Sequence, residues 1–149
     1  MRMALGLVVV GMLSATSVYG QQPAAQAQQV SNARKFADDG GMVLNFIKPD
    51  KTADFEAVIA KLKEALAKNE KWKAQADGWK VFKSPDPAGQ NVLYVFVIDP
   101  AVKDADYQIS NIIAEALPAE ANEILKKYAD CYAQGMNIVN LHLIQALGK

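Results

Sequence analysis

The sequence predicts an α+β fold with strands and helices in the order β-α-β-β-α-β. Three observations support this order. Four short apolar runs, mostly bounded by glycine or proline, are typical of strands. Two longer segments repeat apolar residues at spacings of three and four, the pattern of a helix that covers one face of a sheet. A loop rich in turn-forming residues, with no helical pattern, joins the two middle strands.

The first twenty residues have the parts of a secretory signal. Arg2 supplies the basic start, an apolar run covers residues 3–13, and small residues precede the expected cleavage after Gly20. Cleavage after Ser17 is a nearby alternative. An uncleaved anchor is disfavoured, because the apolar segment is short for a membrane span of about twenty residues. We therefore expect an exported protein, periplasmic or extracellular, with no membrane association after signal removal.

The mature chain is expected to contain a spacer and one domain. Residues 21–35 are rich in Gln and Ala and hold no aromatic side chain, so they can bury little apolar surface. Residues 36–149 form the single α+β domain. Loss of Arg2 leaves 15 basic residues against 16 acidic ones, a formal net charge of −1.

The first strand is expected over residues 42–47, between a glycine pair and a proline. Thr52 is placed to cap the helix that follows, which runs to about Lys68. The helix has one apolar stripe, made of Phe55, Val58, Ile59, Leu62 and Leu66. One or two more helical turns over residues 70–77 end at Gly78.

The middle strands are expected over residues 79–83 and 92–98, joined as a hairpin by the loop 84–91. The second strand of the pair, Val92 to Ile98, is apolar at every position and is the strongest strand signal in the chain.

The second helical segment is expected to begin after Asp104 or Asp106. Pro118 interrupts it and suits the first turn of a following helix. Gly135 ends that helix, and residues 136–144 form the last strand.

This order is that of the split βαβ, ferredoxin-like arrangement. We expect the first strand to lie parallel to the third at the centre of the sheet, with both helices on one face. Because a sheet with one solvated face should alternate polar and apolar residues, the apolar run 92–98 predicts that something covers the second face. The usual cover is a second copy, giving a dimeric α+β barrel. The alternative is a partly exposed aromatic surface formed by Tyr94 and Phe96.

Charge and composition exclude several classes of protein. A formal net charge of zero indicates no excess of positive charge for binding nucleic acid. One Cys and one His cannot form a standard zinc site, and no cofactor or metal is expected. Cys131 lies at the edge of a helical stripe and is expected to be buried, with a disulfide across a dimer as the alternative. Asp104 and Asp106 suit helix capping better than calcium binding, because the further ligands are missing.

The candidate site combines polar residues from the first and last strands with aromatic residues of the third. By alternation, Asn140 and His142 point away from the helices, and so does Asn45. Together with Tyr94 and Phe96, they would line a small-ligand cleft on the second sheet face. His142 is the one candidate acid/base residue near neutral pH. The alternative is that these polar groups are solvated or lie at a dimer rim.

The stretch of residues 46–55 resembles the strand-to-helix entry of dimeric α+β barrel proteins, including the antibiotic-biosynthesis-monooxygenase-like and stress-responsive groups. Together with residues 78–81 and 93–100, it also resembles small exported bacterial proteins of unknown function. The resemblance spans roughly residues 42–145. The resemblance implies a ligand held between helices and sheet by His, Asn or Trp, but no catalytic set aligns residue by residue.

We therefore expect a non-catalytic exported domain, a homodimer that binds a small molecule or another protein through its sheet face. The competing hypothesis is a cofactor-free barrel enzyme, an oxygenase or isomerase, that uses His142 with Asn140 and Asn45. A third is a structural component of the cell envelope.

Overall fold

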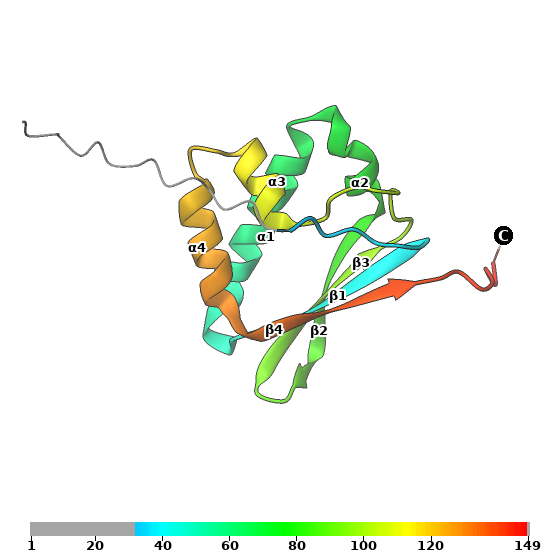
Figure 1. Cartoon of the computed structure of the whole chain (residues 1–149). Coiled ribbons are helices and arrows are strands. Elements are labelled where there is room, and N and C mark those ends of the chain that lie inside the picture. Colours follow the sequence, from blue (N-terminus) through cyan, green and yellow to red (C-terminus); the bar gives the residue numbers. More distant parts are fainter. Residues whose placement is uncertain (1–31, 149) are drawn as a thin grey trace, which may run out of the picture.

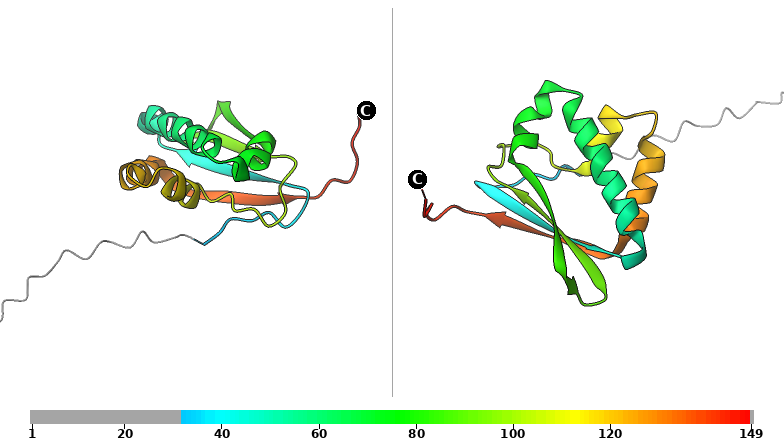
Figure 2. Two further views of the ribbon diagram at one scale, coloured as in Figure 1. Left: turned by 90° about the horizontal axis from the view of Figure 1, so that it is seen from above. Right: turned by 180° about the vertical axis from the view of Figure 1, so that it is seen from behind.

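The computed structural model describes residues 32–148. The expected signal, residues 1–20, and most of the expected spacer lie outside the described residues. The described chain has an α+β fold in which helices cover one face of a four-stranded antiparallel sheet (Figure 1). Figure 2 shows the same two layers from above and from behind.

The strand order in the sheet is β2-β3-β1-β4. The strands are β1 (Gly40–Ile47), β2 (Trp79–Ala88), β3 (Asn91–Ile98) and β4 (Tyr132–Leu141). Every neighbouring pair is antiparallel. As expected, β2 and β4 are the edges and β1 and β3 are central.

The expectation that the first and third strands are parallel is wrong. The helical connection returns the chain so that β2 runs in the same direction as β1, but β3 lies between them. Because β2 and β3 form a hairpin, β3 is antiparallel to both.

The helices follow the predicted order. They are α1 (Thr52–Ala67), α2 (Lys73–Gly78), α3 (Ile109–Ala116) and α4 (Ala121–Cys131), with short 3-10 turns η1 (Pro49–Lys51) and η2 (Glu70–Trp72). Pro118 lies in the break between α3 and α4, as predicted. Thr52 is the first residue of α1 and not its cap, because η1 leads directly into the helix.

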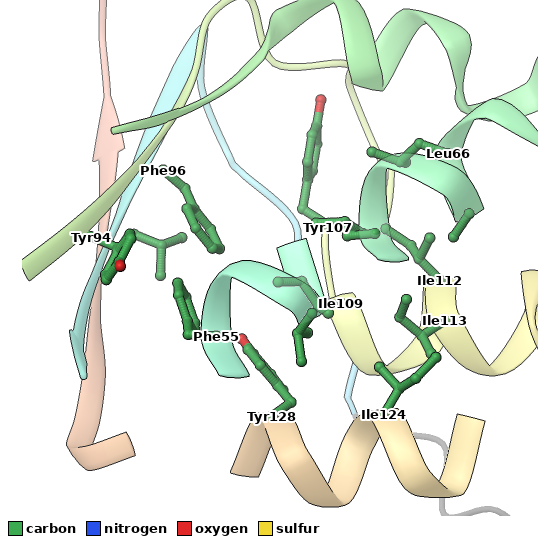
Figure 3. Close-up of a cluster of buried hydrophobic side chains, with 14 of the residues drawn as sticks. Phe55, Leu66, Tyr94, Phe96, Tyr107, Ile109, Ile112, Ile113, Ile124 and Tyr128 are labelled. Atoms are coloured by element: carbon green, nitrogen blue, oxygen red, sulfur yellow. The ribbon is translucent and has the colours of Figure 1, made fainter. Parts of the chain in front are cut away.

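The hydrophobic core lies between the helices and the sheet (Figure 3). Phe55 of α1 is fully buried at its centre, with its ring centroid 4.8 Å from that of Tyr94 and 6.2 Å from those of Phe96 and Tyr128. Tyr94 and Phe96 therefore point toward the helices and form the floor of the core.

Alternation along the central strands identifies the two faces. Val43, Asn45 and Ile47 of β1 are buried under the helices, and the residues between them are half-buried on the other face. The predicted facing of β1 is therefore inverted. Both sets of β1 residues are mostly apolar, so alternation alone does not say which set is buried, and a change of phase by one residue exchanges the faces.

The last strand starts earlier than expected. β4 begins at Tyr132, directly after α4, and ends at Leu141. Its residues pair with β1 so that Ile138 and Asn140 share the side of Val43, while Val139 shares the opposite side. The prediction had Val139 under the helices and Asn140 on the other face, so the facing of this strand is also inverted.

The chain before β1 packs on the helix side of the sheet. The Phe36 ring lies 5.4 Å from that of Tyr107, edge to face. Arg34 N–H donates to Asp106 Oδ1 at 2.7 Å, so Arg34, within the expected spacer, is held against the domain. A Cβ at Gly41 would lie 2.0 Å from the Phe36 ring, so this close approach requires glycine.

Candidate functional site

Asn45 is part of a buried polar network and is not exposed to a cleft. Its amide Nδ2 donates to the carbonyl oxygens of Val43, at 3.1 Å, and Tyr94, at 3.2 Å. Its Oδ1 accepts from the Tyr132 hydroxyl at 2.8 Å. Both amide hydrogens are thus used inside the protein, and the side chain has no exposed surface.

The network continues from Tyr132 to Tyr128, whose hydroxyl oxygens lie 2.7 Å apart. Tyr132 has one hydroxyl proton, and Asn45 Oδ1 can only accept, so that proton is directed to Asn45. The bond between the tyrosines then uses the proton of Tyr128. Burial raises the pKa of both phenols, so both remain protonated and able to donate.

The other predicted site residues do not assemble around Asn45. Tyr94 and Phe96 share its face but are core residues. Asn140 pairs with Gly41, four residues along β1 and about 13 Å away. There its Oδ1 accepts from the Ala37 N–H at 3.2 Å.

His142 lies beyond the end of β4, on the protein surface. Its Nδ1 is 3.0 Å from Asp38 Oδ1 and 3.2 Å from Asp39 Oδ2. Leu143 N–H also donates to Asp39 Oδ2, at 3.0 Å. The cluster ties the chain after β4 to the chain before β1. The constellation of Asn45, Asn140 and His142 on one surface is therefore not formed.

The contacts within this cluster shift the pKa values of His142 and Asp38 in opposite directions. The hydrogen bond to Asp38 and the nearby charges of Asp38 and Asp39 raise the pKa of His142. The bond to His142 lowers the pKa of Asp38. One ligand atom from each of the three residues lies within 4.8 Å of the others, which is close enough for a cation. All three side chains are exposed and already bonded to one another, so the ion pair accounts for their positions.

The second face of the sheet is apolar, and no other element of residues 32–148 covers it (Figures 1 and 2). We call it the open sheet face, and its apolar residues are Met42, Leu44, Phe46, Phe82, Leu93, Val95, Val97, Val139 and Leu141. The Phe82 side chain is 53% exposed. The sequence predicted an apolar second face but assigned Tyr94 and Phe96 to it, whereas Leu93, Val95 and Val97 form it.

A groove of about 500 Å³ lies on the helix side, between α1 and the edge strand β2. We call it the α1–β2 groove. Its apolar lining is Ile59, Leu62, Leu66, Ala67, Ala76, Trp79 and Val81, and its polar lining is Lys63, Asn69, Glu70 and Lys73. The sequence reasoning missed this groove. Trp79 and Val81 alternate on an edge strand, which is the signal for a helix-side surface there, but strand order was needed to see that α1 leaves it partly uncovered.

Comparisons with known proteins identify no relative. No protein-family model matches the chain, and neither a curated protein nor a solved structure matches it. Within residues 32–148, no helix has both the length and the apolar character needed to cross a membrane. Function therefore has to be inferred from the geometry of the described residues.

Proposed function

We propose that the protein is an exported, non-catalytic binding domain that works as a homodimer, with the open sheet face as the contact between copies. The observation that supports this proposal is the open sheet face itself, an apolar surface built from all four strands. The strand order β2-β3-β1-β4, with helices on one face, supports a ferredoxin-like arrangement. Two such sheets packed face to face would form a dimeric α+β barrel.

The composition of the face suits a second copy. Large exposed apolar patches mark interaction sites, and the core of an interface is depleted of charge. Among the paired positions of this face, one residue is charged, Lys80, and it lies on the edge strand β2. An identical sheet presents the same apolar centre and is therefore complementary to it.

The dimensions of the face also fit. Four strands and seven paired positions along β1 and β3 span roughly 19 by 24 Å. Counted as a flat projection, two copies would bury about 900 Å² in total. The solvent-accessible area that they bury is larger, because side chains stand out from the sheet, and it approaches the roughly 1,200 Å² of stable interfaces.

A segment of the same chain is less suited to cover the face. The chain enters the described region on the helix side, where Phe36 packs against Tyr107. The alternative of a cofactor-free barrel enzyme requires Asn45, Asn140 and His142 together on one surface, and these residues lie apart. His142 is instead held by Asp38, beyond the end of β4.

Sedimentation velocity of the mature chain tests the proposal. We expect a dimer at about 100 μM, well above a micromolar Kd. Val95→Glu places a charge at the centre of the open sheet face and should give a folded monomer. Val81→Glu, on the other face, is the control and should remain a dimer. A wild-type monomer at that concentration, or a Val95→Glu dimer, would contradict the proposal, and circular dichroism checks that each variant is folded.

A further inference from the structure

The α1–β2 groove has the size and lining of a small-ligand site. Such sites have volumes of about 300–1,000 Å³ and are mostly apolar, with few polar groups. The walls of this groove come from α1, η2, α2 and β2, and Leu62 and Leu66 on the α1 side are buried in the domain core. The groove is therefore held open by rigid secondary structure.

The floor of the groove is exposed apolar surface that the fold leaves uncovered. Val81 is 38% exposed, and Trp79 is half-buried with its ring 5.9 Å from that of Phe96. Both side chains point to the helix side, since Trp79 pairs with Ile98 and Val81 with Phe96. An apolar ligand body lying here would remove this surface from water.

The charges at the rim favour an anion. Lys63 and Lys73 line the groove together with one carboxylate, Glu70, and Lys73 lies 3.9 Å from it. The other lysines between residues 61 and 73 are paired: Lys61 and Lys68 form ion pairs with Glu64, and Lys71 forms one with Glu115. Lys63 makes no ion pair among the described residues, so its charge is available to a ligand.

We propose that the α1–β2 groove binds an amphiphile with an apolar body and one anionic head, of the chemical class of medium-chain carboxylates. The body lies on Leu62, Leu66, Trp79 and Val81, and the head pairs with Lys63. One unpaired cation suits a single negative charge and not a polyphosphate. The groove is on the helix side of the sheet, so the inference goes beyond the proposed dimer and does not depend on it.

Titration of the mature protein with decanoate, below its micelle-forming concentration, tests the proposal by calorimetry and tryptophan fluorescence. We expect saturable binding with one decanoate per chain. Decyltrimethylammonium, which has the same tail and the opposite charge, should bind more weakly. Lys63→Ala should weaken decanoate binding by about fivefold, as expected for a partly exposed ion pair. Lys61→Ala is the matched control, because Lys61 is paired with Glu64 and Glu120 and should leave binding unchanged.

Two neighbouring substitutions locate the ligand. Val81→Glu should abolish decanoate binding, and Phe82→Glu, on the open sheet face, should retain it. Absence of saturable binding, equal binding of the cationic amphiphile, or loss of binding in Phe82→Glu alone would overturn the proposal. A monomeric wild-type protein that still binds decanoate would contradict only the proposed dimer. Lys63→Glu is a second variant that leaves the apolar floor unchanged, and it should weaken decanoate binding even if Val81→Glu does not fold; unchanged binding would overturn the proposed contact with the anionic head.

Discussion

Val81 and Phe82 are adjacent on β2, and their side chains lie on opposite faces of the sheet. Val81 pairs with Phe96 on the helix side, and Phe82 pairs with Val95 on the open sheet face. The two side chains are 38% and 53% exposed. One peptide bond therefore separates the floor of the α1–β2 groove from the proposed dimer contact.

This relationship predicts that two similar substitutions have opposite effects. Phe82→Glu should weaken the dimer by at least about tenfold, because an exposed aromatic residue is lost from the interface and a charge is buried in its place. Val81→Glu should leave the dimer intact and abolish decanoate binding, which Phe82→Glu should retain. Concentration-dependent sedimentation of both variants measures dimerisation, and decanoate titration measures ligand binding. If one substitution abolishes both dimerisation and decanoate binding, the two surfaces are not independent.

The hydroxyl network predicts an order of stability losses. Tyr132→Phe leaves the buried Asn45 Oδ1 without a donor, so it should lower the free energy of unfolding by about 1–3 kcal/mol. Tyr128→Phe removes one bond but leaves the donation from Tyr132 to Asn45, and should cost about 0.5–1.5 kcal/mol. Urea denaturation of both variants tests the order. A larger loss for Tyr128→Phe would contradict the assigned direction of the protons.

The close approach of Phe36 to β1 predicts a difference between two glycines. Gly41→Ala places a methyl group against the Phe36 ring and should destabilise the protein by about 1–3 kcal/mol. Gly135→Ala meets nothing within 4 Å and should be neutral or stabilising by up to about 1 kcal/mol. Thermal unfolding compares the two. Equal effects would mean that Phe36 does not hold the chain before β1 in place.

The order of the strands and helices could be predicted because each element depends on local sequence pattern. The stripe from Phe55 to Leu66 and the break at Pro118 are properties of short stretches, and both are found in the structure. The strand β2 is longer than expected because it continues through Pro85 and Pro87. Proline is tolerated there because β2 is an edge strand and needs no partner on its outer side.

The site could not be predicted because it depends on distant contacts. Asn45 was assigned to an exposed face because it is polar, but Tyr132, 87 residues away, satisfies its Oδ1 under the helices. Similarly, alternation placed His142 on a strand face, whereas Asp38, 104 residues away, holds it beyond the end of β4. Local periodicity contains no information on either partner.

The buried position of Cys131 predicts that its thiol reacts slowly with disulfide reagents. The sequence predicted its burial, and in the structure the side chain has no exposed surface. Burial raises the pKa of the thiol, which lowers the thiolate fraction. A disulfide reagent such as dithiobis(nitrobenzoate) should therefore react at least about a thousandfold more slowly with the folded protein than with the protein in urea. Fast reaction of the folded protein would reopen the alternative of a disulfide between copies.

The cluster of His142 with Asp38 and Asp39 predicts a pH window for the chain after β4. The pKa of His142 is raised above its ordinary value of 6.5, so its contribution to stability is complete below pH 6.5 and is lost as the pH rises through the folded pKa. The pKa of Asp38 is lowered below 3.8, so its contribution is complete above pH 3.8 and is lost as the pH falls through the folded pKa. The attachment should therefore be strongest between about pH 4 and 6.5.

Proton NMR can follow this attachment directly, because His142 is the one histidine in the chain. We expect its ring resonances to titrate above pH 6.5, and Asp38→Asn combined with Asp39→Asn should return the pKa to about 6.5. Hydrogen exchange of the Leu143 N–H, which donates to Asp39, should be slowest within the same window. An ordinary pKa for His142 in the wild-type protein would mean that the ion pair does not persist in solution and that the segment after β4 is held by its backbone contacts alone.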